Sequence, residues 1–194
     1  VASRGLYFIH ISLQYHCIQI LRNLRPLPRA AVETDPMESL LKPTLQLLAI
    51  LAAAMVSGSV FGIWRGYDPA GYSPAAFVEV HQGAVRGLNV LLPAIGLATI
   101  LLTVILTVQA GRQSRAFPLY LLAVLGFLAG GIVTRFGNQP INAVIMQWTA
   151  ASMPADWQAM RDSWWTWHKL RLAASVGGLL FLVAAVLADR PGAG

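Results

Sequence analysis

The feature that most constrains the fold is a set of long apolar stretches. Three of them carry no charged side chain, and the fourth carries only Arg171. An α-helix needs about 20 apolar residues to cross the hydrocarbon core of a bilayer. We therefore predict an all-α fold, an integral membrane four-helix bundle with up-down topology, whose spans cover residues 45–64, 88–108, 117–134 and 170–188.

The overall composition supports a membrane location. Hydrophobic residues make up 56% of the chain and charged residues 11%, whereas soluble domains carry about 25% charged residues. The formal net charge of +6 comes mostly from residues in loops and at helix ends. This placement favours anionic lipid headgroups as partners and predicts no binding of nucleic acid.

The connections between the spans differ greatly in length. Residues 109–116 form a short polar turn, whereas residues 65–87 and 135–169 form long connections rich in aromatic side chains. In an up-down bundle both long connections lie on the same side, so we predict structured loops on one membrane face. The short turn carries Arg112 and Arg115 without an acidic residue. Because cytoplasmic loops are rich in basic residues, we predict that both termini are cytoplasmic.

Residues 1–36 differ from the rest of the chain and form a predicted N-terminal extension. Their apolar segment is interrupted by polar residues and lacks the pattern of a signal peptide. One interpretation is a helix that lies in the membrane interface. The other is that translation starts at Met37 and the preceding residues lie upstream of the true start. The transmembrane domain is predicted to cover residues 37–194.

Polar residues gather where the long connections meet the spans. Trp164, His168 and Arg171 follow a spacing of four and three residues, so they share one helix face, and Trp165 lies beside it. Ionisable groups within a membrane are costly and tend to be functional. An alternative is that Trp157, Trp164 and Trp167 form an aromatic belt at the headgroups and that His168 is merely hydrogen-bonded there.

The first long connection contributes a second group of polar residues. Glu79 and His81 lie just before the second span, and His81 lies on a different helix face from Glu79. His81 is therefore the second histidine candidate for a pocket. Glu79 has an alternative role in a plain polar stripe along the surface of its helix.

The segment that follows the third span, Thr134 to Asn142, has a compact polar motif. Gly137 is expected to end the helix in a left-handed conformation. Asn138 is expected to cap a new helix whose first turn contains Pro140. Capping explains much of this motif, but its compactness also favours a turn in which Asn138 and Asn142 face a ligand.

A metal or haem site is an alternative that the residue types allow. His81 and His168, together with Glu79, are residue types that bind a non-haem metal, and two histidines can hold a haem axially. No histidine pair with ligand spacing occurs, so no metal site is assigned. A separate pattern, Gly58 and Gly62 in the first span, predicts a close helix contact rather than chemistry.

Two motifs together resemble those of the anthrone oxygenase family. They are Asn138-Gln-Pro-Ile-Asn142 and Trp164-Trp-Thr-Trp-His168, the latter followed by Arg171 at the head of the last span. The resemblance covers about residues 39–188 and implies a four-helix membrane protein. Some fungal members oxidise anthrones to anthraquinones with molecular oxygen and need no obvious cofactor. Here the resemblance implies a cofactor-independent oxygenase of apolar aromatic substrates in a bacterial inner membrane.

The resemblance also suggests roles for particular residues. His168, with His81 second, is the candidate general base that forms a carbanion from the acidic methylene of an anthrone. Arg171 or Asn138 would stabilise the enolate oxygen, and Trp164 and Trp165 would stack on the substrate. The other substrate-binding candidates are Asn142 and Glu79.

A non-enzymatic role is the alternative interpretation. The protein would then bind a lipid or a quinone-like ligand, or serve as an accessory subunit of a larger membrane complex. An apolar small molecule is the expected ligand in either case, and a homo-oligomer is compatible with both.

Overall fold

The computed structural model describes residues 36–190, and residues 1–35 and 191–194 lie outside the described part. The prediction for residues 1–36 therefore falls, except for Pro36, on residues that are not described. Residues from Leu40 onward belong to one compact unit, and the following description concerns that unit. Its described residues form helices and short connections, without a strand.

The bundle consists of helices of two kinds. Four helical segments are long and apolar enough to cross a membrane, and the others are short. The predicted all-α membrane bundle is thus confirmed. The elements are α2 (Pro36–Gly66), η1 (Pro69–Gly71), α3 (Pro74–Leu88), α4 (Leu91–Ala110), α5 (Ala116–Val133), η2 (Thr134–Asn138), α6 (Gln139–Ile145) and α7 (Trp157–Ala188).

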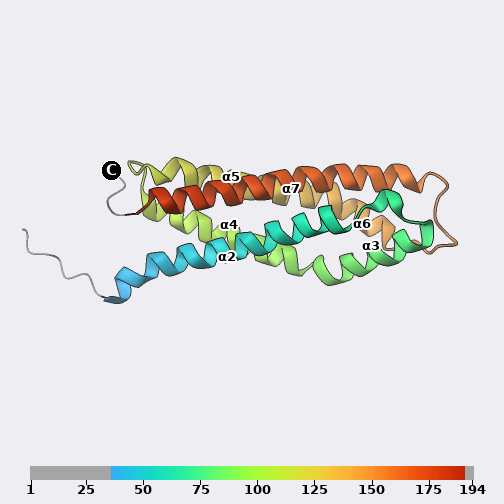
Figure 1. Cartoon of the computed structure of the whole chain (residues 1–194), viewed down its shortest axis with the longest axis horizontal. Coiled ribbons are helices and arrows are strands. Elements are labelled where there is room, and N and C mark those ends of the chain that lie inside the picture. The colour runs from blue at the N-terminus through green and yellow to red at the C-terminus, as the bar shows by residue number, and fades with distance from the viewer. Residues whose placement is uncertain (1–35, 191–194) are drawn as a thin grey trace, which may run out of the picture. The chain divides into compact units, whose positions relative to one another are not determined.

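The long helices alternate in direction along the bundle (Figure 1). The short turn between α4 and α5 lies at one end, which is also where α7 finishes. Helices α3 and α6 and the connection that precedes α7 lie at the opposite end (Figure 1). This arrangement confirms the predicted up-down order with structured connections gathered on one face.

The second span begins later than the sequence predicts. Helix α3 ends at Leu88, and α4 begins only at Leu91. Pro93 has no N–H to donate to the carbonyl of Asn89, and its ring would clash with that carbonyl if one helix continued through this point. Just beyond Pro93, the N–H of Ala94 donates to the oxygen of Val90 at 3.1 Å.

The predicted helix end at Gly137 is wrong. Gly137 does not adopt a left-handed conformation, and the backbone continues through the wide π-helical turn η2 into α6. Asn138 forms no side-chain cap, although Pro140 does lie in the first turn of α6. Pro140 cannot donate an ordinary helical hydrogen bond, which is the physical reason for a local change in winding. The N–H of Gln139 instead donates to the oxygen of Thr134, five residues earlier.

Helices α5 and α7 approach each other most closely where both carry glycine. A Cβ atom on Gly126 would lie 2.9 Å from the Cα of Gly178, and one on Gly178 would lie 2.8 Å from the Phe127 ring. Small residues let helix backbones pack closely in a membrane. The predicted contact at Gly58 and Gly62 is not found, since no atom outside their own helix lies within 4 Å of a Cβ placed there.

One stripe of α7 is buried along almost its whole length. Its residues recur at intervals of three, four or seven positions, as expected for one helix face. The aromatic-belt interpretation is wrong for Trp157 and Trp164, which are buried inside the protein, while Trp167 remains 38% exposed. The buried residues are Trp157, Trp164, His168, Ser175, Gly178, Leu182 and Ala185.

Polar contacts attach α2 to the C-terminal half of α7 and to Asp189, which follows it. Near the end with the short turn, Lys42 forms an ion pair of 2.7 Å with Asp189, which also accepts a hydrogen bond from Gln46. Towards the opposite end, the hydroxyl of Ser57 donates to the carbonyl of Ser175 at 3.1 Å. These contacts hold α2 along the side of the bundle where the main cavity lies.

Candidate functional site

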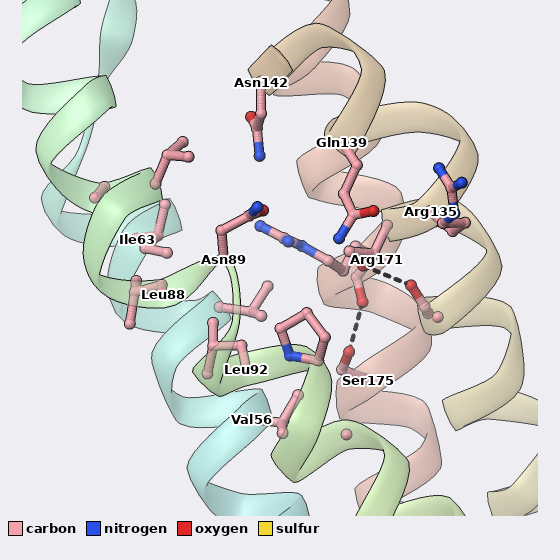
Figure 2. Close-up of a pocket in the computed structure, with 18 of the residues that line it drawn as sticks. Val56, Ile63, Leu88, Asn89, Leu92, Arg135, Gln139, Asn142, Arg171 and Ser175 are labelled. Atoms are coloured by element: carbon pink, nitrogen blue, oxygen red, sulfur yellow. Dashed lines mark hydrogen bonds between the residues drawn. The ribbon is translucent and has the colours of Figure 1, made fainter. Parts of the chain in front are cut away.

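A cavity of about 370 Å³ lies among the helices, and residues of α3 and α6 form part of its lining. Its wall is mostly apolar, with contributions from α2, α3, α4 and α5. The labelled residues in Figure 2 show Val56, Ile63, Leu88 and Leu92 facing a group of polar side chains across the cavity. The polar side chains of the wall are Asn89, Gln139, Asn142, Arg171, Arg135, Thr134, Thr99, Ser175, His81 and Tyr67.

Arg171 is the charged group at the centre of the site. Figure 2 shows its guanidinium between Asn89 and Gln139, whereas Arg135 lies at the edge and is exposed. The Nε atom of Arg171 is buried and has no hydrogen-bond partner. Among residues 36–190, no carboxylate forms an ion pair with this guanidinium. A positive charge thus faces an apolar cavity without a compensating negative charge from the described protein.

The imidazole of His168 contacts the guanidinium of Arg171. Its Nδ1 lies 2.7 Å from Nη2 of Arg171, and its Nε2 lies 3.1 Å from the carbonyl oxygen of Val60. A carbonyl only accepts and a guanidinium only donates. Nε2 therefore carries the proton and Nδ1 accepts, which is the neutral form of the ring. His168 is fully buried and does not line the cavity.

Two indole rings pack on the His168 imidazole. Trp165 stacks on it with an interplanar angle of 3° and a centroid distance of 5.3 Å, and Trp164 with 17° and 5.1 Å. Trp164 also lines the cavity, whereas Trp165 does not. The predicted shared face of Trp164, His168 and Arg171 is thus present, and its aromatic members restrict the histidine ring.

His81 belongs to a second hydrogen-bond network on the cavity wall. Oδ1 of Asn142 accepts from Nε1 of Trp164 at 2.8 Å and lies 3.2 Å from Nε2 of His81. Because the indole N–H is only a donor, the atom that it meets must be the amide oxygen. Nε2 of His81 therefore donates to that oxygen, and Nδ1 accepts from the hydroxyl of Tyr67 at 3.2 Å.

The environment of His81 keeps its ring neutral. Burial lowers the pKa of His81 from 6.5 to about 4, partly offset by its hydrogen bond to Asn142. A buried imidazole without a nearby carboxylate loses the charged form in this way. At neutral pH, His81 is an uncharged group that bonds to Tyr67 and Asn142.

The comparison with protein families now bears on this site. The sequence model described as anthrone oxygenase matches residues 82–181, just over half of the chain. The chain belongs to the anthrone oxygenase family. The matched segment contains Asn142, Trp164, His168 and Arg171, while Tyr67 and His81 precede it. Neither the curated proteins nor the solved structures that were compared include a match.

Besides His168 and Trp165, two more predicted site residues of this family member do not line the cavity. Asn138 is buried beside α7, where its amide nitrogen donates to the carbonyl of Trp164 at 3.1 Å. Its Oδ1 atom is buried without a partner. Glu79 is exposed and does not line the cavity. Of the predicted site residues, those that line the cavity are thus His81, Asn142, Trp164 and Arg171, and the others do not line it.

The two histidines do not form a shared ligand site. Trp164 contacts both rings, with centroid distances of 4.8 Å to His81 and 5.1 Å to His168. The ring nitrogens of each histidine are already hydrogen-bonded within its own network. In the part of the chain that the structure describes, no group of three or more histidine, cysteine, aspartate or glutamate residues is placed to hold a metal ion.

Two residues of the wall were not singled out by the sequence. Tyr67 follows the first span closely and donates to His81, but nothing in its neighbourhood marks it as different from an interfacial tyrosine. Gln139 lies within the polar motif that begins at Asn138, so its position next to two predicted site residues was an available signal. Figure 2 shows that its amide points towards Arg171.

Proposed function

We propose that this member of the anthrone oxygenase family binds a flat, apolar aromatic compound with an acidic group and oxidises it with molecular oxygen. The compound would occupy the apolar cavity, and its developing anion would lie against Arg171. The observation that carries this proposal is the guanidinium at an apolar wall, with a buried Nε atom that has no partner. The positive charge favours an anion beside it, and an anionic form of the ligand would supply one.

Electrostatics gives Arg171 its proposed role. A fixed positive charge in a site of low dielectric constant stabilises an enolate or phenolate much more strongly than water does. It also lowers the free energy needed to remove a proton from the bound compound. Asn89, Gln139 and Asn142 lie near the guanidinium (Figure 2) and offer amide donors for the same oxygen.

The proposed reaction converts an acidic methylene to a ketone. Removal of one methylene proton leaves a carbanion whose charge extends to the oxygen beside Arg171. The carbanion carbon bonds to one atom of molecular oxygen and, after a proton returns, forms a hydroperoxide. Loss of water from the hydroperoxide gives the ketone, so one oxygen atom stays in the product and the other leaves as water.

We assign the proton acceptor to His81 rather than to His168. His81 lines the cavity, whereas His168 does not. The ring nitrogens of both histidines are hydrogen-bonded, so Nδ1 of His81 would accept the proton only after its hydrogen bond from Tyr67 breaks. Since the pKa of His81 is lowered to about 4, it would accept a proton only from a substrate whose acidity Arg171 has raised. His168 then acts as a positioning residue for the guanidinium.

The test compares Arg171 variants in nanodiscs with anthrone as the substrate. Arg171→Gln removes the charge and should reduce kcat/KM by roughly 100-fold or more, as for loss of a group that stabilises a transition-state anion. Arg171→Lys keeps the charge and should retain part of the rate. The measurements are oxygen uptake and absorbance of the anthraquinone, with empty nanodiscs as the control for spontaneous oxidation. An unchanged rate in Arg171→Gln would refute the proposed role.

A second candidate function is binding without catalysis. It is favoured by the involvement of every ring nitrogen of His81 and His168 in a hydrogen bond. In that case a quinone-like or phenolic ligand would bind beside Arg171 without oxygen uptake. Ligand binding that depends on Arg171, with oxygen consumption equal to that of empty nanodiscs, would select this function, including an accessory role in a larger complex.

The site also has a proposed position relative to the membrane. The four apolar helices make this an integral membrane protein. The arginines of the short turn favour a bacterial inner membrane orientation with that turn and both termini in the cytoplasm. The end with α3 and α6, and therefore the cavity, would lie on the outer side. Labelling of a cysteine introduced at Gln113 from either side of sealed vesicles tests this orientation.

A further inference from the structure

The wall of the cavity is incomplete on the side of α4. Leu97 lines the cavity, yet this residue is 58% exposed. A residue that both lines a cavity and lies on the outer surface marks a place where the two are continuous. Pro93, one turn earlier on α4, also lines the cavity and is exposed.

This exposed edge lies in the part of the protein that faces hydrocarbon. Leu97 lies near the beginning of α4, whose residues Leu91–Ala110 form one of the candidate membrane spans. The first membrane helix contributes the apolar side chains of Val56, Val60 and Ile63 to the lining. Apart from Thr99, which is buried on α4, the side chains that α4 and α2 contribute to the lining are apolar, which suits contact with lipid chains.

The polar groups of the site lie on the other side. Figure 2 shows Val56, Ile63 and Leu92 across the cavity from Gln139 and Arg171. A molecule that entered past Leu97 would meet apolar side chains first and the guanidinium last. An apolar body with one ionisable oxygen fits this order, since its body would remain in apolar surroundings while its oxygen reaches the positive charge.

We infer that the gap between α2 and α4 at Leu97 is a lateral entrance, through which an uncharged, lipid-dissolved aromatic with one ionisable hydroxyl or enol group passes from the bilayer to Arg171. This inference rests on the proposed function, because it concerns the ligand of the same site. It adds that the ligand arrives in its neutral form from hydrocarbon and becomes an anion only beside the guanidinium.

A polar mouth is the competing route. A second hollow adjoins the cavity and shares the lining residues Asn89, Gln139 and Asn142 with it. Ala143 lines the second hollow but not the cavity. Ala143 is exposed. A ligand that entered from water would pass this end instead, so substitutions at Leu97 and Ala143 separate the two routes.

The test measures binding kinetics of 2-hydroxyanthraquinone added to nanodiscs that contain the full chain. The absorbance of this probe shifts to longer wavelength when its hydroxyl ionises, so the shift reports arrival at Arg171. Leu97→Trp should slow both association and dissociation by about tenfold or more and leave Kd within about twofold, since a narrowed entrance changes access without changing the bound state. Leu101→Trp is the matched control, because Leu101 lies one turn further on the same helix, is 54% exposed and does not line the cavity.

Each outcome has a defined meaning. Slower exchange in Leu97→Trp, with wild-type rates in Leu101→Trp and Ala143→Trp, supports the lateral entrance. Wild-type rates in Leu97→Trp, or slower exchange in Ala143→Trp alone, overturn it and leave the role of Arg171 standing. A wild-type protein that binds no probe, or an Arg171→Gln variant with an unaltered absorbance shift, overturns the proposed function and the entrance with it. Leu97→Ala widens the gap and should exchange the probe faster. This second variant keeps the inference testable if Leu97→Trp does not fold.

Discussion

His168 and Arg171 lie one turn apart on α7, and Nδ1 of the imidazole accepts a hydrogen bond of 2.7 Å from Nη2 of the guanidinium. The opposite ring nitrogen bonds to the carbonyl of Val60 on α2. The histidine thus links two membrane helices and fixes the direction of the charge that faces the cavity. His168, whose residue type suggests a catalytic base, is therefore proposed to position its neighbour Arg171.

This relationship makes opposite predictions for two substitutions of His168. In His168→Gln, the amide can donate to Val60 and accept from Arg171, so kcat/KM should stay within about threefold of wild type. In His168→Leu, the guanidinium loses its support, and a misplaced group in the site should cost roughly 10- to 100-fold. Oxygen uptake with anthrone, measured across pH, provides the comparison. Equal losses in both variants, together with a lost pH dependence, would instead identify His168 as the proton acceptor.

Stability should fall as the pH is lowered because of His81. Its pKa is 6.5 when unfolded and about 4 when folded. Below pH 6.5 the unfolded chain therefore binds a proton that the folded protein does not, and this continues until the pH reaches about 4. The free energy of unfolding should decrease by about 3 kcal/mol over that interval, at 1.36 kcal/mol per pKa unit. Unfolding of wild type and His81→Gln by SDS in mixed micelles at several pH values measures the difference in slope. The same slope in both would show that other groups cause it.

The close approach of α5 and α7 predicts a sharp difference between glycines. A Cβ on Gly126 would lie 2.9 Å from backbone of α7, which cannot move aside as a side chain can. Gly126→Ala should therefore destabilise the protein by about 1–3 kcal/mol, as overpacking does. Gly177→Ala is the control, since no atom lies within 4 Å of the added Cβ there, and it should be neutral or slightly stabilising. Thermal unfolding in detergent tests both, and equal Tm values would contradict the close packing.

The ion pair at the other end of the bundle should matter more than an exposed one. Asp189 accepts from Lys42 at 2.7 Å, from Gln46 at 3.1 Å and from Tyr120 at 3.2 Å. Asp189→Ala removes the shared acceptor of three donors and should cost about 1–3 kcal/mol. The Asp162 partner of Arg161 is 64% exposed, so Asp162→Ala should cost less than about 1 kcal/mol. Chemical unfolding of the two variants provides the comparison, and a similar cost for both would argue against a role of Asp189 in holding α2.

Much of the fold followed from local patterns. The apolar stretches predicted the four spans because only helices satisfy their own backbone groups in hydrocarbon. The positions of helix breaks were harder to predict. Near Pro93 the chain breaks between α3 and α4, just before Leu91. Pro140, in contrast, follows a π-helical turn through which the chain stays helical. The same residue type thus has different effects, depending on whether neighbouring turns can change their winding.

The site was predicted in part, for a similar reason. The spacing of Trp164, His168 and Arg171 places them on one helix face, whatever the rest of the fold does. Their roles depend on partners that are distant in sequence, since Val60 lies 108 residues before His168. No local pattern connects these two residues.

The sequence alone therefore determined the all-α membrane class, the up-down order and the helix face that carries the polar residues. These properties depend on hydropathy and on a fixed helical period. Only the tertiary structure decided that Arg171 faces the cavity, that His168 and Asn138 lie behind its wall, and that Leu97 lies at an open edge. Such distinctions depend on which side chains fill the space between helices, and that is set by packing between segments far apart in the chain.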